Sequence, residues 1–213
     1  TSEKAEKAVA VHSEIIKNLI TVADAAKDEK AVDAIVEKTT ELLDSSIALV
    51  EKLEAGETAV NTVKDMIERV GGLYKALDDN IEKDSSRAKT LLAEKIINAA
   101  ERAIQKAAMS ELQKDGLVIE QEKAIARADA VSLQAAAKTA AESARKIAEK
   151  LRESEIEPNR NIKPIVVVNV PTVEGMREVE VDLPAGVLDV VREADVDALE
   201  IRTGVADFRV DAE

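Results

Sequence analysis

Four carboxylates near the C-terminus are the side chains in this sequence best suited to chemistry. Asp182, Asp195, Asp197 and Asp207 lie in a segment where acids outnumber bases. Carboxylate oxygens are the ligands that a hard cation such as Ca²⁺ prefers. The four could bind calcium if their loops converged, but a solvated acidic face is the simpler interpretation. The sequence therefore predicts no cofactor or metal ligand, with calcium at these weak candidates as the one exception.

A second acidic stretch, Asp78-Asp79-Asn80-Ile81-Glu82, suggests the calcium loop of an EF-hand. That loop needs a glycine at its sixth position and a bidentate acid at its twelfth. Counted from Asp78, the sixth position is Lys83. We interpret the stretch as an acidic helix end followed by a loop.

Histidine and cysteine, two of the common catalytic residue types, are nearly absent. His12 is the only histidine and there is no cysteine, which excludes thiolate chemistry and Cys-based zinc sites. No nucleophile elbow or glycine-rich phosphate loop is present. A hydrolase that uses two carboxylates is one hypothesis that the many acids allow. Sites that cleave sugars usually add aromatic platforms, however, and Tyr74 and Phe208 are the only aromatic residues. The sequence therefore predicts no catalytic residues and no enzyme.

The net charge of −13 limits the classes of partner. Phosphate backbones and anionic lipid surfaces repel such a chain. No apolar run is long enough to span a membrane, and no signal peptide is present. We therefore expect neither nucleic-acid binding nor membrane insertion.

The prolines divide the chain into two architectures. All four, Pro158, Pro164, Pro171 and Pro184, follow residue 157. Proline breaks a helix interior, so the proline-free part is free to form long helices. The sequence predicts a helical bundle at 1–153, a charged linker at 154–161 and a small mixed α/β module at 162–213. The expected fold class is α+β, mostly α.

The first part carries apolar residues at heptad spacing, as in a coiled coil or a helical bundle. We expect an elongated antiparallel bundle of four or five helices. The expected inward positions of the first helix are Ala5, Ala8, His12, Ile15, Leu19 and Val22, widened by Val9 and Ile16. Those of the second are Val32, Ile35, Thr39, Leu42, Ser46, Leu49 and Leu53, widened by Val36, Leu43 and Val50. Those of the third are Val60, Val63, Ile67, Val70, Tyr74, Leu77 and Ile81.

Turn and capping residues predict where these helices begin and end. Asp28 is the expected N-cap of the second helix, and Gly56 is the expected glycine after its end. Gly71-Gly72 is either a tight turn or a weak point in one helix, and the unbroken apolar phase favours one helix. The sequence Asp84-Ser85-Ser86 is expected to precede a fourth helix that runs toward Asp115-Gly116. A fifth helix, rich in small residues, is expected over 119–151.

The C-terminal part reads as strands around one helix, in the order ββαββ. The apolar run 165–168 predicts a strand covered on both faces. Residues 177–183 alternate apolar and acidic, which predicts a half-buried strand after a loop at 171–175. Pro184 is expected in the first turn of a helix that buries Val187, Leu188 and Val191 and ends near Ala194-Asp195. Strands at 196–202 and 205–210 would form a hairpin around Gly204.

The stretch 178–210 reads EVEVDLPAGVLDVVREADVDALEIRTGVADFRV. It resembles modules of Gram-positive bacterial cell-surface proteins, in which a valine-rich strand, Leu-Pro, a short helix, a strand, Thr-Gly and a further strand follow one another in S-layer-type proteins. The resemblance implies a secreted, envelope-associated, multidomain parent. No S-layer-homology anchoring repeat is present. Leu183-Pro184-Ala185-Gly186 lacks the Thr-Gly ending and the membrane tail of a sortase signal.

These observations predict a non-catalytic structural or interaction module of a cell-envelope protein. The bundle would act as a spacer, and the acidic strand module would dock other protein modules or copies of itself, because one helix covers only one face of a sheet. Cell-wall association would come through the parent protein. The alternative is a helical sensor-type domain that binds a ligand or partner in a groove near Gly71-Gly72 or along the fifth helix.

Overall fold

The structure is a computed structural model that describes residues 1–26, 28–80, 86–115, 117–120, 125–170, 179–203 and 206–211. Several predicted features lie outside these residues: the loop at 171–175, the turn at Gly204, the capping pair Asp84-Ser85, Gly116 and the last two residues, 81–82, of the acidic stretch 78–82. The described side chains exclude those of residues 79, 80, 86 and 115.

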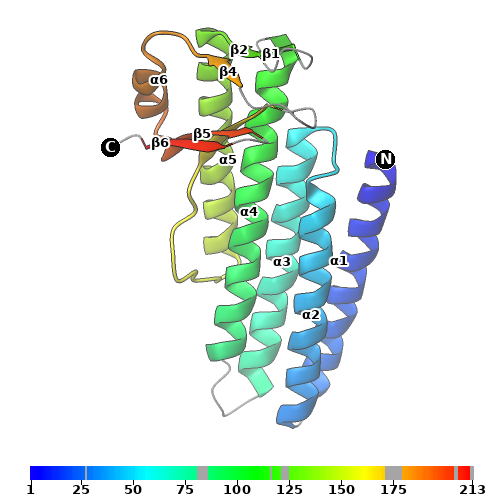
Figure 1. The fold of residues 1–213 in the computed structure, drawn as a ribbon. Helices are drawn as coiled ribbons and strands as arrows, with labels where there is room; N and C mark the ends of the chain where they lie inside the picture. The colour runs from blue at the N-terminus through cyan, green and yellow to red at the C-terminus, as the bar shows by residue number, and fades with distance from the viewer. Residues whose placement is uncertain are drawn as a thin grey trace. The chain divides into compact units, whose positions relative to one another are not determined.

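The described residues form an α+β fold that is mostly helical, as predicted (Figure 1). The helices are α1 (Ser2–Ala25), α2 (Glu29–Val50), α3 (Gly56–Asn80), α4 (Ser86–Asp115), α5 (Ala130–Glu153) and α6 (Val187–Glu193). The strands are β1 (Leu117–Glu120), β2 (Ile125–Ala128), β3 (Ile165–Val170), β4 (Glu180–Asp182), β5 (Ala198–Thr203) and β6 (Asp207–Asp211).

The chain divides into two compact units, which we describe separately. Unit 1 contains residues 1–103 and 145–162, and unit 2 contains residues 104–144 and 163–213. The long helices α4 and α5 each contribute one part to each unit. This division differs from the predicted boundary at 153–162, because the last part of α4 and the first part of α5 belong to the same unit as the strands rather than to the bundle.

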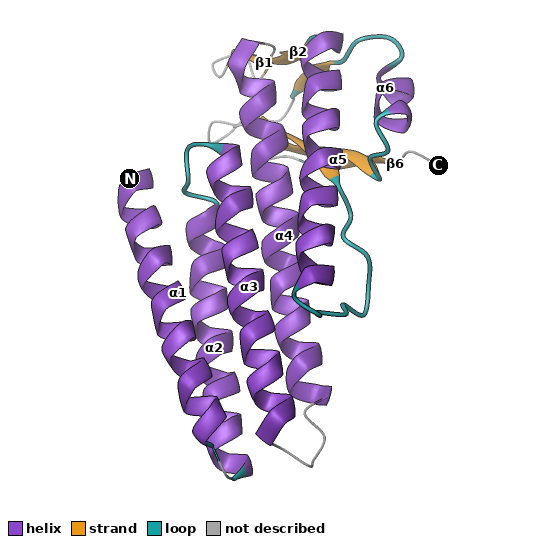
Figure 2. Ribbon diagram, turned by 180° about the vertical axis from the view of Figure 1, so that it is seen from behind, coloured by secondary structure: helices purple, strands orange, loops and turns teal. Residues whose placement is uncertain are grey.

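Unit 1 is an antiparallel helical bundle. The helices α1, α2 and α3 lie beside the first part of α4 and the last part of α5, and successive helices alternate in direction (Figures 1 and 2). Their apolar residues recur every three or four positions, so each helix buries one stripe. The largest fully buried side chains in this unit are Ile16, Leu43, Leu53, Ile67, Leu73, Leu77, Leu92, Ile96, Ile97 and Ile147.

The helix α3 continues through Gly71-Gly72, which confirms the prediction of a single helix. Gly71 is needed for a close approach. A Cβ atom at this position would lie 2.7 Å from both the Cβ and the carbonyl oxygen of Ser154. The predicted groove near this pair is therefore filled at Gly71 by the segment that follows α5.

Two helix predictions need correction. Gly56 does not follow the end of α2; it is the first residue of α3, while α2 ends at Val50 and Leu53 is buried in the connection. In α1 the predicted Ala5, Val9 and Ile16 are buried together with Ala23, but Ile15 and Val22 from the predicted stripe are exposed.

The predicted linker at 154–161 is instead part of unit 1. Ser154 is 8% exposed and Ile156 is 2% exposed. Further along, the Arg160 guanidinium pairs with the Glu101 carboxylate and donates from Nη2 to Asn98 Oδ1 at 3.1 Å. The charged composition of this segment reflects ion pairing with α4 rather than a free connection.

The predicted fifth helix begins later than expected. Residues 117–120 and 125–128 form an antiparallel hairpin, β1 with β2, and α5 starts only at Ala130. Ala126 and Ala128 are buried while Arg127 between them is exposed, which is the two-residue period of a strand. Alanine is compatible with both the two-residue period of a strand and the 3.6-residue period of a helix, so the sequence alone did not distinguish a strand from a helix here.

Unit 2 contains two three-stranded sheets, ordered β1-β2-β4 and β3-β5-β6. The strand β4 pairs in parallel with β2, so the strands of the C-terminal segment do not form one sheet among themselves. The strands β3 and β5 are parallel, which requires the crossover that contains α6. The strand β6 returns antiparallel to β5 as the predicted hairpin.

The strand and helix order of the C-terminal segment, ββαββ, agrees with the prediction, and β3 is buried on both faces as expected. Pro184 lies before α6 rather than in its first turn: its carbonyl accepts from the Val187 N–H, and Gly186 with φ 80° is the N-cap. Leu188 was expected inside but is 43% exposed; of the three predicted residues, only Val191 is buried.

Candidate functional site

The four candidate carboxylates lie at three places in unit 2. Asp182 ends β4, Asp195 and Asp197 follow α6, and Asp207 begins β6. Among the described residues, no three histidine, aspartate or glutamate side chains gather as a metal site. The convergence that calcium binding would require is therefore not found for this set.

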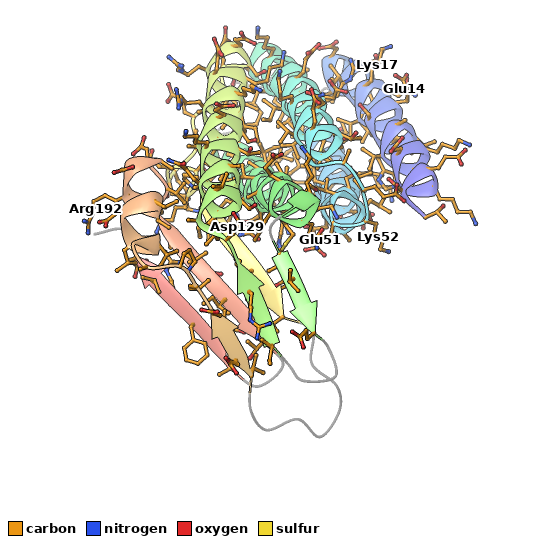
Figure 3. The ribbon with its side chains drawn as sticks, turned by 90° about the horizontal axis from the view of Figure 1, so that it is seen from above. Glu14, Lys17, Glu51, Lys52, Asp129 and Arg192 are labelled. Carbon is orange, nitrogen blue, oxygen red and sulfur yellow. The ribbon has the colours of Figure 1, made fainter. Side chains whose placement is uncertain are left out.

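Asp182 lines a shallow pocket of about 280 Å³ together with Val118, Arg127, Ala128, Asp129 and Pro184. Arg127 compensates the nearby acids: its Nε lies 3.9 Å from Asp182 Oδ2, and its Nη1 lies 2.7 Å from Glu120 Oε1. Asp129 is the cap of α5 (Figure 3), and its pKa is lowered first by the Ser132 backbone N–H, which donates to Oδ1 at 2.9 Å. These carboxylates are held by the protein's own donors.

Asp195 and Asp197 line a second pocket of about 460 Å³ with Lys163, Arg192, Val196, Arg209 and Asp211. Three cationic and three acidic side chains therefore face the same hollow. Asp195 has φ 60°, a backbone conformation that aspartate adopts more readily than most residues. The Asp197 N–H donates to the Pro164 carbonyl at 2.9 Å, which fixes the entry to β5. The mixed charge favours neither a metal ion nor a single anion.

Asp207 belongs to the β5–β6 hairpin. The Thr203 N–H donates to Asp207 Oδ1 at 3.2 Å, and the Thr203 N–H and hydroxyl both donate to the Ala206 carbonyl. The carboxylate therefore stabilises the turn.

His12 packs between helices, as the sequence predicted. Its Nδ1 lies 2.8 Å from Ser46 Oγ across the contact of α1 with α2, and burial lowers its pKa. The Tyr74 side chain also links two helices, because its hydroxyl donates to the Lys89 carbonyl. Burial raises the pKa of Tyr74. Among the described residues, every buried side-chain nitrogen or oxygen has a hydrogen-bond partner. No buried polar group there is left to bind a ligand.

The strand β6 is one of the two edge strands of the β3-β5-β6 sheet. Among the described residues, β5 is the only strand that pairs with β6. The Thr203 N–H bond to Ala206 places the hydrogen-bonded pairs of the hairpin at Ile201 with Phe208 and at Leu199 with Val210. Because such pairs alternate along an antiparallel ladder, the main-chain groups of residues 207, 209 and 211 point away from β5.

The side chains of this edge strand are exposed on both faces. Phe208 is 59% exposed, and Val210 on the same face is partly buried. On the opposite face, Arg209 Nη1 donates to Glu200 Oε1 at 2.9 Å and Nε donates to Asp211 Oδ1 at 2.7 Å. These bonds raise the pKa of Arg209 and hold its side chain beside the edge. Sequence reasoning expected a strand here; only the sheet order identified it as an edge.

A second exposed surface lies on α1 in unit 1. Val11, Ile15 and Val22 are 57%, 36% and 53% exposed. Their spacing of four and seven residues places them on one face of the helix. This face carries apolar side chains that the bundle does not cover.

Comparison of the chain with protein-family models, with curated proteins and with solved structures finds no match. Within the described residues, none of the helices combines the length and the hydropathy needed to cross a membrane.

Proposed function

We propose that this chain is a non-catalytic structural module of a cell-envelope protein, and that it joins other protein chains through the outer edge of β6. In this proposal the helical unit is the spacer and the β3-β5-β6 sheet is the docking surface. The envelope location rests on the resemblance of residues 178–210 to modules of bacterial surface proteins.

The observation that carries the proposal is the open edge of β6. An unpaired strand edge presents main-chain donors and acceptors that an incoming strand can pair with. The three residues whose main-chain groups point away from β5 are all charged: Asp207, Arg209 and Asp211. An edge with alternating charges selects a strand with the complementary pattern and discourages unspecific pairing. The exposed ring of Phe208 adds apolar area beside this edge.

A photo-crosslinking amino acid at position 208 tests this proposal, because it replaces one exposed aromatic ring with another. We expect light-dependent adducts with a protein partner in the cells that make the chain. The same amino acid at Lys52, exposed in the turn after α2 (Figure 3), is the control position. Adducts in equal yield from both positions, or none from 208, would contradict the proposal.

A second substitution tests whether the main chain carries the contact. Arg209→Pro removes an N–H that points away from β5, so the β5–β6 ladder keeps all its bonds. Arg209→Ala loses the same bonds to Glu200 and Asp211 but keeps the N–H. We expect the adduct at 208 to persist in Arg209→Ala and to disappear in Arg209→Pro. Equal adducts in both variants would exclude strand pairing.

Fractionation of the same cells tests the envelope part of the proposal separately. We expect the chain in the cell-wall or secreted fraction. An exclusively cytoplasmic distribution would contradict the location while leaving the docking edge untouched.

A second candidate function is favoured by the exposed face of α1. A helix with uncovered apolar residues at this spacing can pack against a partner helix. The sensor-type alternative would then act through Val11, Ile15 and Val22 rather than through a groove at Gly71-Gly72. The photo-crosslinking amino acid at position 15 tests it: adducts from 15 and none from 208 would favour this candidate over the first.

A further inference from the structure

The charge order of β6 is complementary to itself in two antiparallel registers, one centred on Phe208 and one centred on Val210. Pairing β6 with a second β6 about Phe208 places Asp207 opposite Arg209 of the second copy, and Arg209 opposite its Asp207. Pairing about Arg209 instead places Arg209 against Arg209 and Asp207 against Asp211. Opposite charges across a strand pair stabilise it and like charges destabilise it, which disfavours the register about Arg209. Pairing about Val210 also places Arg209 opposite Asp211 of the second copy, but only pairing about Phe208 brings the two exposed Phe208 rings opposite one another.

The main-chain geometry permits the same register. Residues 207 and 209 have N–H and C=O groups that point away from β5, so they can form the hydrogen-bonded pairs between two copies. Phe208 then occupies the non-hydrogen-bonded pair on the two-fold axis, where opposed Cα atoms are about 4.5 Å apart and side chains meet most closely. Two exposed aromatic rings would cover one another there.

The side chains of β6 can make these contacts without losing their present ones. Arg209 uses Nε and Nη1 in its bonds to Asp211 and Glu200. A guanidinium carries five N–H donors, so further donors remain for a carboxylate of a second copy. Asp207 accepts from the Thr203 N–H through Oδ1, and a carboxylate has lone pairs for more than one donor.

We propose that β6 pairs with β6 of a second copy of this chain, antiparallel and centred on Phe208, to give a continuous six-stranded sheet. The inference rests on the docking edge of the proposed function and names its partner. It predicts a symmetric dimer with two reciprocal Asp207–Arg209 pairs and one Phe208–Phe208 contact.

Sedimentation equilibrium of the full chain over a concentration series tests the dimer. We expect reversible dimerisation, and we expect Asp207→Arg and Arg209→Asp each to be monomeric, because each places like charges opposite one another. A mixture of the two variants restores opposite charges in both pairs and should dimerise. Recovery in the mixture also shows that each variant is folded. A strict monomer at every concentration overturns the inference.

A disulfide test determines the register, because the chain has no cysteine of its own. Phe208→Cys places the two thiols on the axis, within the Cα separation that a disulfide needs. We expect this variant to form covalent dimers on mild oxidation. Val210→Cys is the matched control, because residue 210 faces residue 206 of the second copy and should remain reduced. Crosslinking of the control in place of Phe208→Cys overturns the register.

The outcomes separate this inference from the proposed function. If photo-crosslinking at 208 yields adducts with other proteins and the purified chain stays monomeric, the docking edge stands and the second copy is excluded. If neither occurs, both proposals fall.

Discussion

At Gly71, the absence of one side chain allows two segments of unit 1 to touch. The residue lies inside α3, where glycine is disfavoured by about 1 kcal/mol relative to alanine. It is tolerated because Ser154 occupies the space where a Cβ atom would lie. The adjacent Gly72 differs: a Cβ atom there would meet only the tip of the Ile20 side chain, at 3.0 Å. The two glycines therefore have different physical roles.

We predict that Gly71→Ala lowers the free energy of unfolding by about 1–2 kcal/mol, because overpacking against the Ser154 backbone outweighs the gain in helix propensity. Gly72→Ala is the matched control and should leave stability unchanged or raise it by up to about 1 kcal/mol, since the Ile20 tip can move. Urea unfolding of the two variants measures the difference. Equal losses would show that the close approach at Ser154 is not the constraint.

His12 gives the bundle a small dependence on pH. Burial lowers its pKa from the ordinary value of 6.5, so the folded chain holds this proton less tightly than the unfolded chain does. The contribution of His12 is therefore fully present above pH 6.5 and is lost as the pH falls through the lowered pKa. We predict that the melting temperature falls less between pH 7.5 and pH 5 in His12→Gln than in the wild type. The same fall in both would show that His12 does not contribute.

At the scale of elements, the segment after α5 is fixed by charge and packing together. Ile156 is buried, and the Arg160 guanidinium forks onto both oxygens of Glu101, with Nη2 to Oε2 at 3.0 Å. Hydrogen bonding to Glu101 raises the pKa of Arg160. A planar guanidinium that bonds a carboxylate through two nitrogens holds its geometry better than a single contact does.

We predict that Arg160→Ala loosens this segment without unfolding the bundle. A protease that cuts after glutamate should cleave at Glu155 or Glu157 several times faster in the variant, while the melting temperature changes little because the pair is partly exposed. Arg152→Ala, at an exposed position in the last turn of α5, is the control. Unchanged cleavage in Arg160→Ala would show that Ile156 alone holds the segment.

Helix positions were predictable where one period dominated. The three- and four-residue spacing of large apolar residues located α2 and α3, and Asp28 was correctly predicted as the cap of α2, accepting from the Ala31 N–H at 2.9 Å. The hairpin at 117–128 was missed because Ala126 fits a strand and a helix equally well. Gly56 was misplaced because glycine is strongly enriched just after a helix, whereas here it is the first residue of α3.

At the scale of the whole molecule, unit 2 is discontinuous in sequence. Its strands β3 to β6 come from the C-terminal segment, while β1, β2 and parts of α4 and α5 come from residues 104–144. The strand β4 finds its partner in β2, and β3 is buried on both faces. A segment of about 50 residues rarely buries enough apolar surface to be stable alone.

We predict that residues 163–213 made alone do not unfold cooperatively, whereas residues 104–213, which include all of unit 2, do. Circular dichroism with thermal melting measures both fragments. A cooperative transition in the shorter fragment, with the midpoint of the longer one, would show that the C-terminal segment is an independent domain.

For the candidate site, too, the sequence showed the residue types but not which residues lie next to one another. The sequence identified Asp182, Asp195, Asp197 and Asp207 as acids but not their neighbours, so it could not separate a cation site from paired charges. Arg127 beside Asp182, and the cations around Asp195 and Asp197, lie far away in sequence or in another element. The edge position of β6 was equally hidden, because strand order depends on which strands pair.

By itself, the sequence determined the fold class, the order of most helices and strands, and the scarcity of histidine, cysteine and aromatic residues. These depend on local periods and on composition, which the chain carries in every short window. Only the tertiary structure decided that β4 joins β2, that 154–162 packs into the bundle, and that β6 is an edge. Those outcomes depend on contacts between residues far apart in the chain, where alanine-rich and charged segments fit more than one partner.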